Sequence, residues 1–176
     1  MSAASSLRAF SGLPEPNDYA TYQRNVAEAH DRTRALVAEV AADFAATFGR
    51  EKVASLELTG DPSADTAIVA IGTIGETATE LLADDMPLLV ARIHTYRPFP
   101  GEELAAALEH VSHVVAVDRA PAFGAPGPLG EDVRAFGIPA TDVVCGLGGS
   151  DVTPDTLRRA LATSGRDAVY LVGGGA

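Results

Sequence analysis

The stretch TAIVAIGTIGETATELLADDMPLLVARI, residues 66–93, decides the fold class. It opens and closes on runs of strand length, residues 66–72 and 87–93, and both are apolar enough to be buried on two faces of a sheet. Between them, the spacing predicts a helix over residues 74–82. Because a chain that returns through a helix enters the next strand in the same direction, this unit predicts two parallel strands.

The same alternation continues toward the end of the chain. Helices are expected over residues 101–110, 128–136 and 154–163, and strands over residues 113–119, 140–146 and 169–172. Residues 53–58 differ, because they alternate as a half-buried strand does and only a short turn separates them from the next strand. They should pair antiparallel or lie at an edge. The pattern therefore predicts an α/β fold, a three-layer α/β/α sandwich on a mostly parallel sheet with an antiparallel edge strand.

The first fifty residues divide into two parts. Residues 1–16 are rich in Ser, Ala, Gly and Pro, which is typical of a flexible leader. A long helix is expected over about residues 19–48, because apolar residues recur there every three or four positions. These residues are Tyr22, Val26, Ala29, Thr33, Val37, Val40, Phe44 and Phe48. The expected organisation is a leader over 1–16 and a single α/β domain over 17–176 that begins with this helix.

Composition restricts the partners and the compartment. The chain of 176 residues has a formal net charge of −11, which disfavours binding to nucleic acid or to acidic membranes. It has no apolar stretch near the ~20 residues of a membrane-spanning helix and no secretory signal pattern, so a cytoplasmic location is expected. The single cysteine, Cys145, cannot by itself close an intramolecular disulfide or hold a zinc or iron–sulfur site.

In an open α/β sheet, ligands bind where parallel strands end at their carboxyl side, so the strand ends supply the candidate sites. AIGTIGET, residues 70–77, places Gly72 and Gly75 at a strand-to-helix turn whose amides could hold an anion. The pattern lacks the third glycine of the dinucleotide fingerprint. A tight turn that lets the helix pack closely is the alternative interpretation of both glycines.

A second candidate follows the expected strand at 113–119. Asp118 and Arg119 end that strand, and a loop rich in glycine and proline follows them. The next helix carries Glu131 and Asp132 in its first turn, and these acids would oppose a phosphate there. Asp118 is more simply expected to pair with an arginine or to cap a helix.

The chain offers little for catalysis. The four histidines lack the spacing of metal ligands, and neither a GxSxG elbow nor a GxxxxGK[ST] loop occurs. The residues alone therefore predict a well-formed α/β domain with no catalytic residue, no cofactor-binding residue and no metal ligand.

YRPFP, residues 96–100, is the most distinctive strand end. Pro98 and Pro100 cannot extend a central strand, so they turn the chain out of the sheet and hold Arg97 on a stiff corner. A guanidinium held in this way suits bidentate pairing with a carboxylate. That carboxylate could belong to the domain itself or to a partner chain, and Tyr96 and Arg97 are therefore interface candidates.

Six short motifs occur in a characteristic order along the chain. They are FxxxFGR (44–50), AIVAIGT (67–73), YRPFP (96–100), VDR (117–119), GPL (127–129) and GLGGSDVT (146–153). Together they resemble the C-terminal part of the alpha chain of 2-oxoacid:ferredoxin oxidoreductases, with pyruvate:ferredoxin oxidoreductase as the closest named member. The resemblance extends over about residues 20–162 and implies a transketolase C-terminal-like domain.

The resemblance also implies a division of labour between chains. In that family thiamine diphosphate lies between two other domains, which bind its pyrimidine and its diphosphate, and iron–sulfur clusters carry electrons away. The resemblance therefore implies a non-catalytic subunit of a hetero-oligomer that decarboxylates a 2-oxoacid such as pyruvate. Thiamine diphosphate, Mg²⁺ and any iron–sulfur clusters would be held by partner chains. Two alternatives stay open: a subunit of a non-redox thiamine-dependent ligase or decarboxylase, and a stand-alone module that binds a small anion.

Overall fold

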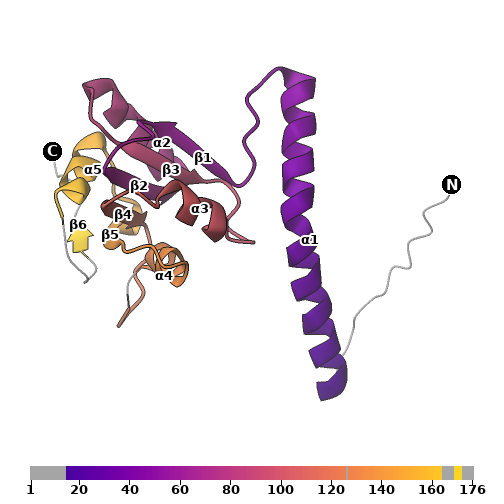
Figure 1. Cartoon of the computed structure of the whole chain (residues 1–176). Helices are drawn as coiled ribbons and strands as arrows, with labels where there is room; N and C mark the ends of the chain where they lie inside the picture. Colours follow the sequence, from indigo (N-terminus) through magenta and orange to yellow (C-terminus); the bar gives the residue numbers. More distant parts are fainter. Residues whose placement is uncertain (1–14, 126, 164–168, 172–176) are drawn as a thin grey trace.

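The computed structural model describes residues 15–125, 127–163 and 169–171, so residues 1–14 of the expected leader and residue 172 of the expected last strand lie outside the described residues. The elements in chain order (Figure 1) are α1 Pro16–Phe48, β1 Leu56–Gly60, β2 Thr66–Ile71, α2 Thr73–Thr79, η1 Glu80–Asp84, β3 Leu89–Ile93, α3 Gly101–Ala107, β4 His113–Asp118, α4 Pro128–Ala135, β5 Thr141–Cys145, η2 Leu147–Gly149, α5 Pro154–Leu161 and β6 Val169–Leu171.

The strands form a single sheet with the order β1-β3-β2-β4-β5-β6. β1 runs antiparallel to β3, and every other neighbouring pair is parallel. The predicted mostly parallel sheet with an antiparallel edge strand is thus confirmed. β1 begins three residues later than expected, because its ladder pairs Leu56 with Ile93 and Gly60 with Leu89. The length of β3 therefore sets the limits of β1.

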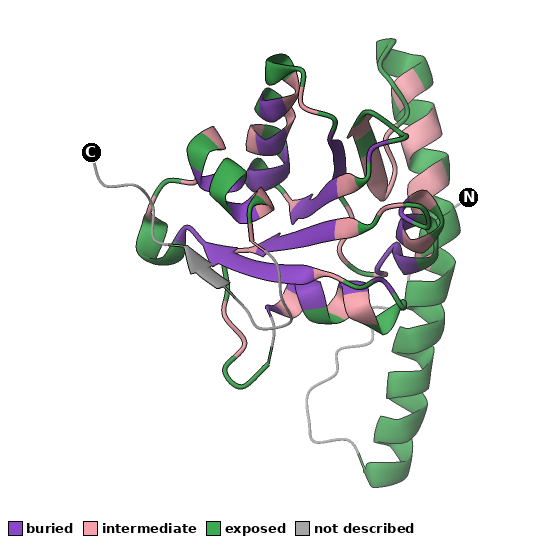
Figure 2. Cartoon of the chain, turned by 60° about the vertical axis from the view of Figure 1, so that its left-hand side comes forward, coloured by how far each residue is buried: buried purple, intermediate pink, exposed green. Residues whose placement is uncertain are grey.

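Helices cover both faces of the sheet and give the predicted three layers. One core cluster joins α2, η1 and α5 to one face through Ile74, Leu81 and Leu157 respectively. The other joins α3 and α4 to the opposite face through Leu104 and Val133. Buried residues of the central strands alternate between the two clusters, as the two-residue period of a strand requires. Figure 2 shows the buried strands enclosed between these helices.

The connections reverse direction between β2 and β4. From β2 the chain passes through α2 to β3 on one side, and from β4 it passes through α4 to β5 on the other side. The helices that leave these adjacent strands lie on opposite faces of the sheet. A crevice therefore opens at the carboxyl ends of β2 and β4. This is the topological switch point of the sheet, where α/β proteins usually bind ligands.

Helix α1 differs from the other helices. It begins at Pro16 after an N-cap at Glu15 and ends before Gly49, whose φ of 63° is the left-handed value that glycine adopts easily. No residue of α1 is buried, and none belongs to either core cluster. In Figure 1 it stands beside the sandwich as a separate arm, joined to β1 by residues 49–55. The sandwich therefore completes its core without α1.

Candidate functional site

The crevice at the switch point is a shallow cavity of about 300 Å³. Residues from the end of β2 and the start of α2 line one side, and residues from the end of β4 line the other. The lining residues are Ile71, Thr73, Ile74, Val117, Asp118, Arg119 and Ala120. The fold thus brings together the AIGTIGET turn and the Asp118–Arg119 pair, which the sequence offered as separate candidates.

The two glycines of the AIGTIGET turn are required for different structural reasons. Gly72 combines φ 60° with ψ −131°, a conformation that side chains other than glycine rarely adopt, although a Cβ there would meet open space. At Gly75 the limit is space, because a Cβ would lie 2.6 Å from Cγ of Arg92. Gly75 therefore lets α2 lie on the aliphatic stem of Arg92, in line with the close-packing interpretation of this turn.

Asp118 holds the start of α4. Its Oδ2 accepts a hydrogen bond of 2.8 Å from the backbone N–H of Leu129, and its carboxylate also accepts one from the N–H of Gly130. Burial raises the pKa of Asp118, while these two hydrogen bonds act in the opposite direction. The side chain thus serves as a helix cap, which was one of the two expected roles.

Arg119 is the cation of the crevice. It is exposed, and its guanidinium lies beside Gly146 at the end of β5. Within residues 15–125, 127–163 and 169–171, Arg119 forms no ion pair. The crevice thus combines mostly apolar walls with the carboxylate of Asp118 and the positive charge of Arg119.

The YRPFP corner is closed by an ion pair inside the domain. Nη2 of Arg97 lies 3.0 Å from Oδ1 and 2.9 Å from Oδ2 of Asp132 on α4, and Nη1 donates to the carbonyl of Tyr96 at 3.0 Å. The guanidinium also lies over the Tyr96 ring, 4.1 Å from its centroid. Although half of the Arg97 side chain is exposed, its polar contacts are made within the domain. Of the two carboxylates considered for Arg97, one in the domain and one on a partner chain, the structure shows the one in the domain.

Tyr96 shares the same carboxylate. Its hydroxyl donates a hydrogen bond of 2.5 Å to Oδ2 of Asp132. Burial, followed by the neighbouring Asp132, raises the pKa of Tyr96 to about 12. Tyr96, Arg97 and Asp132 therefore form one unit that fastens the chain after β3 to helix α4.

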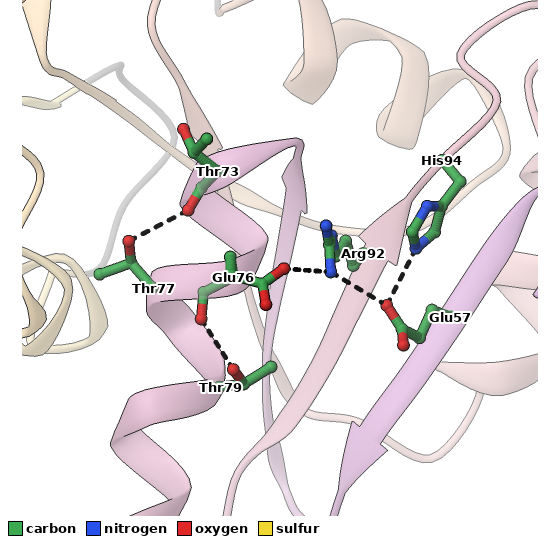
Figure 3. Close-up of polar contacts among 7 residues, drawn as sticks. All are labelled: Glu57, Thr73, Glu76, Thr77, Thr79, Arg92 and His94. Carbon is green, nitrogen blue, oxygen red and sulfur yellow. Dashed lines mark hydrogen bonds and ion pairs between the residues drawn. The ribbon is translucent and has the colours of Figure 1, made fainter. Parts of the chain in front are cut away.

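A further charged group lies near the sheet edge and was not predicted. Arg92 of β3 pairs with Glu57 of β1 at 3.4 Å and with Glu76 of α2, while Nε2 of His94 lies 2.9 Å from Oε2 of Glu57 (Figure 3). Glu57 and Arg92 are direct partners across the antiparallel ladder. Opposite charges at facing positions would have been a usable signal, but only once the register of β1 on β3 was known.

A buried ion pair fastens α4 to β5 and was also missed. The side chain of Asp142 is 1% exposed and pairs with Arg134, but its Oδ1 has no hydrogen-bond partner in the described part of the chain. Burial raises the pKa of Asp142, and the Arg134 guanidinium acts in the opposite direction. The sequence did not reveal that Asp142 is buried, because TDVVC is typical of an ordinary strand in which the acid could have faced solvent.

The described residues contain neither a cluster of metal ligands nor a membrane-spanning helix. Across residues 15–125, 127–163 and 169–171, no group of three or more His, Cys, Asp and Glu side chains is placed to hold a metal ion. None of the described helices is long and apolar enough to cross a membrane.

The chain resembles characterised proteins over most of its length. Residues 64–157 match the family model described as pyruvate:ferredoxin oxidoreductase core domain II. The pyruvate synthase subunit PorA of Thermotoga maritima is 33% identical over 81% of this chain and 38% of its own length. The ketoisovalerate oxidoreductase subunit VorA of Pyrococcus horikoshii is 28% identical over 82% of this chain and 39% of its own. A solved 2-oxoglutarate:ferredoxin oxidoreductase from Magnetococcus marinus is 18% identical with a TM-score of 0.45, over 62% of this chain and 20% of that one.

The matches cover most of this chain but only part of each relative. The chain spans less than half the length of the curated relatives it matches. A match over 81% of the chain is longer than the segment that follows α1, so it also includes part of that helix. With more than half of its residues inside the family model, the chain belongs to the pyruvate:ferredoxin oxidoreductase core domain II family.

Proposed function

We propose that this chain is a non-catalytic subunit of a multi-chain, thiamine diphosphate-dependent 2-oxoacid:ferredoxin oxidoreductase. The complex would oxidatively decarboxylate a 2-oxoacid such as pyruvate. One observation carries the proposal: residues 64–157 match core domain II of this family, and the relatives PorA and VorA are themselves named as subunits. The remaining parts of the enzyme would come from other chains.

The cofactors in this proposal belong to those other chains. Partner chains would supply the domains that bind the pyrimidine and the diphosphate of thiamine, together with Mg²⁺ and the iron–sulfur clusters. Mg²⁺ takes oxygen ligands, and Asp118 is the single carboxylate among the residues that line the crevice. Because Asp118 is engaged by the amides of α4, this crevice does not fit a metal–diphosphate group.

The contribution of this chain would be structural. Its sandwich completes both core clusters by itself and leaves the long arm α1 outside them. The corner at Tyr96 and Arg97 presents a rigid surface, because the contacts to Asp132 hold both side chains. A finished domain with a projecting arm suits assembly with other subunits.

Co-expression tests the proposal. The chain would be produced with the chains encoded beside it, and we expect these to co-purify and to turn over pyruvate or another 2-oxoacid only when thiamine diphosphate is present. Reduction of a ferredoxin or a viologen dye would identify the redox enzyme. Thiamine-dependent turnover without dye reduction would instead identify the non-redox ligase or decarboxylase. A chain that joins no partner, in a mixture where the other chains are active without it, would contradict both.

The crevice favours a second candidate function, a module that binds a small anion by itself. Its position at the switch point and the exposed Arg119 at its rim support this candidate. Titration of the purified chain with inorganic phosphate, followed by calorimetry, would test it. We would expect binding that Arg119→Gln abolishes and that Arg24→Gln, a change on the distant helix α1, leaves intact.

A further inference from the structure

Helix α1 displays an apolar stripe along its whole length. Seven of its large hydrophobic residues are between 36% and 64% exposed: Tyr19, Tyr22, Val26, Leu36, Val40, Phe44 and Phe48. An amphipathic helix in a globular protein normally turns such a stripe toward a core. Here the helix of 33 residues, about 50 Å long, contributes no residue to either core cluster. Figure 2 shows the exposed surface of this arm.

The stripe is complementary to itself. In two identical antiparallel helices related by a two-fold axis at Thr33, residues equidistant from Thr33 face each other. Val26 then faces Val40 and Ala29 faces Val37, so that apolar residues meet in the middle of the helix, while Tyr19, Leu36 and Phe48 lie opposite Thr47, His30 and Asp18. Ala29 and Thr33 at the centre are small and permit close approach. Spacings of three and four residues keep the stripe on one side of the helix.

We propose that α1 pairs antiparallel with α1 of a second copy of this chain, around a two-fold axis at Thr33. Such an isologous contact uses the same surface of both copies and is closed after two of them. Arg24 and Glu28 lie on the opposite side of the helix and stay hydrated. The inference goes beyond the proposed function, because the pairing is a property of this chain and requires no other subunit.

The exposed area suffices for such a contact. A buried aromatic side chain covers about 150–250 Å². The rings of Tyr19, Phe44 and Phe48 are 49–64% exposed, and Leu36 and Val40 are each 57% exposed. Covering the stripe on both copies therefore removes on the order of 1,000 Å² from solvent, near the lower limit for a specific interface. A dimer that forms at micromolar concentration is the expected strength.

The experiment uses the full chain. We expect light scattering after size-exclusion chromatography to give the mass of two chains, and Phe44→Asp to reduce it to one by placing a charge in the apolar contact. Glu28→Gln, on the opposite side of α1, should leave the dimer intact. Because α1 lies outside both core clusters, the thermal unfolding of the sandwich should be the same for all three proteins, which shows that Phe44→Asp has folded.

A cross-link tests the register. The native Cys145 is buried, so a cysteine introduced by Thr33→Cys is the accessible thiol, and mild oxidation should convert most of that variant into covalent dimers. Arg24→Cys places the thiol about two and a half turns away, on the opposite side, and should remain monomeric on a denaturing gel.

Four outcomes would overturn the proposal. A wild-type chain that stays monomeric at micromolar concentration would do so. A dimer that survives Phe44→Asp, or in which Thr33→Cys does not cross-link, would show that the copies meet elsewhere. A monomeric chain whose binding to a co-expressed subunit is lost in Phe44→Asp would assign the stripe to that subunit. Failure of the co-expression experiment above leaves the proposal intact, because the two use different measurements.

Discussion

Arg97 and Asp132 are 35 positions apart in the sequence, yet one guanidinium nitrogen of Arg97 lies within 3.0 Å of both carboxylate oxygens of Asp132. The contact joins the corner that follows β3 to helix α4. It holds Arg97 over the ring of Tyr96 and engages the arginine within the domain. Four predictions follow from this corner and from two close-packed glycines.

Replacement of Arg97 should lower the stability of the domain, because this side chain is already paired within the domain. Arg97→Ala removes the ion pair and the contact with the Tyr96 ring. Because half of the arginine side chain is exposed, we expect the free energy of unfolding to fall by only about 1 kcal/mol. Arg97→Lys should recover little of it, since an ammonium cannot reproduce the planar contact. Urea unfolding monitored by circular dichroism measures both, with Arg24→Ala on α1 as the control, and full recovery by lysine would contradict the geometry.

Tyr96 should make the domain sensitive to alkali. Its pKa is raised in the folded protein from 10.0 to about 12, so the folded state keeps a proton that the unfolded state releases. The resulting stabilisation is complete below pH 10 and is lost as the pH rises from 10 to 12. Comparison of urea midpoints between pH 9 and pH 11.5 should show a fall for the wild type that is smaller for Tyr96→Phe. Tyr19→Phe on α1 is the matched control, and parallel curves for the wild type and Tyr96→Phe would refute the prediction.

Gly130 should not tolerate a side chain. A Cβ at this position would overlap Oδ1 of the buried Asp142, and α4 cannot move away without breaking the Arg134–Asp142 pair. We expect Gly130→Ala to lower the free energy of unfolding by about 3 kcal/mol. Gly124→Ala meets open space and should cost only about 1 kcal/mol for its positive φ. Thermal denaturation of both variants tests this, and similar losses would show that the contact with Asp142 is unimportant.

Gly75 and Arg92 should be energetically coupled. Gly75→Ala pushes a methyl group against the stem of Arg92 and disturbs its ion pairs with Glu57 and Glu76. We expect a loss of about 2 kcal/mol in the wild type and a smaller loss in an Arg92→Ala background, where the stem is absent. A double-mutant cycle in urea measures the coupling. If the two changes are additive, the tight approach of α2 to β3 is not what requires Gly75.

The correspondence between sequence and structure was closest for the sheet. Apolar runs at β2 and β3 and the helix between them predicted parallel pairing, and the alternation in β1 predicted an antiparallel edge. The boundaries were less accurate: α3 ends at Ala107 rather than at residue 110, and α2 gives way to the 3₁₀ segment η1. These ends depend on the next turn of the chain, which periodicity does not describe.

The candidate site was predicted only in pieces. The rule that ligands gather at strand ends singled out Gly72, Gly75, Asp118 and Arg119, and the crevice does contain Asp118 and Arg119. The sequence did not predict why position 75 requires glycine or which carboxylate pairs with Arg97, because both depend on residues from other elements. Asp142 was missed, since a carboxylate in a strand has no local feature that marks it as buried.

By itself, the sequence determined the α/β class, the direction of the strands, the proline corner and the apolar stripe of α1, because each follows from residues a few positions apart. Only the tertiary structure decided the strand order, the pairing of Arg97 with Asp132, and the fact that the stripe of α1 faces away from both cores. Periodicity shows that a surface is apolar but not which other surface covers it, since that depends on contacts between distant segments.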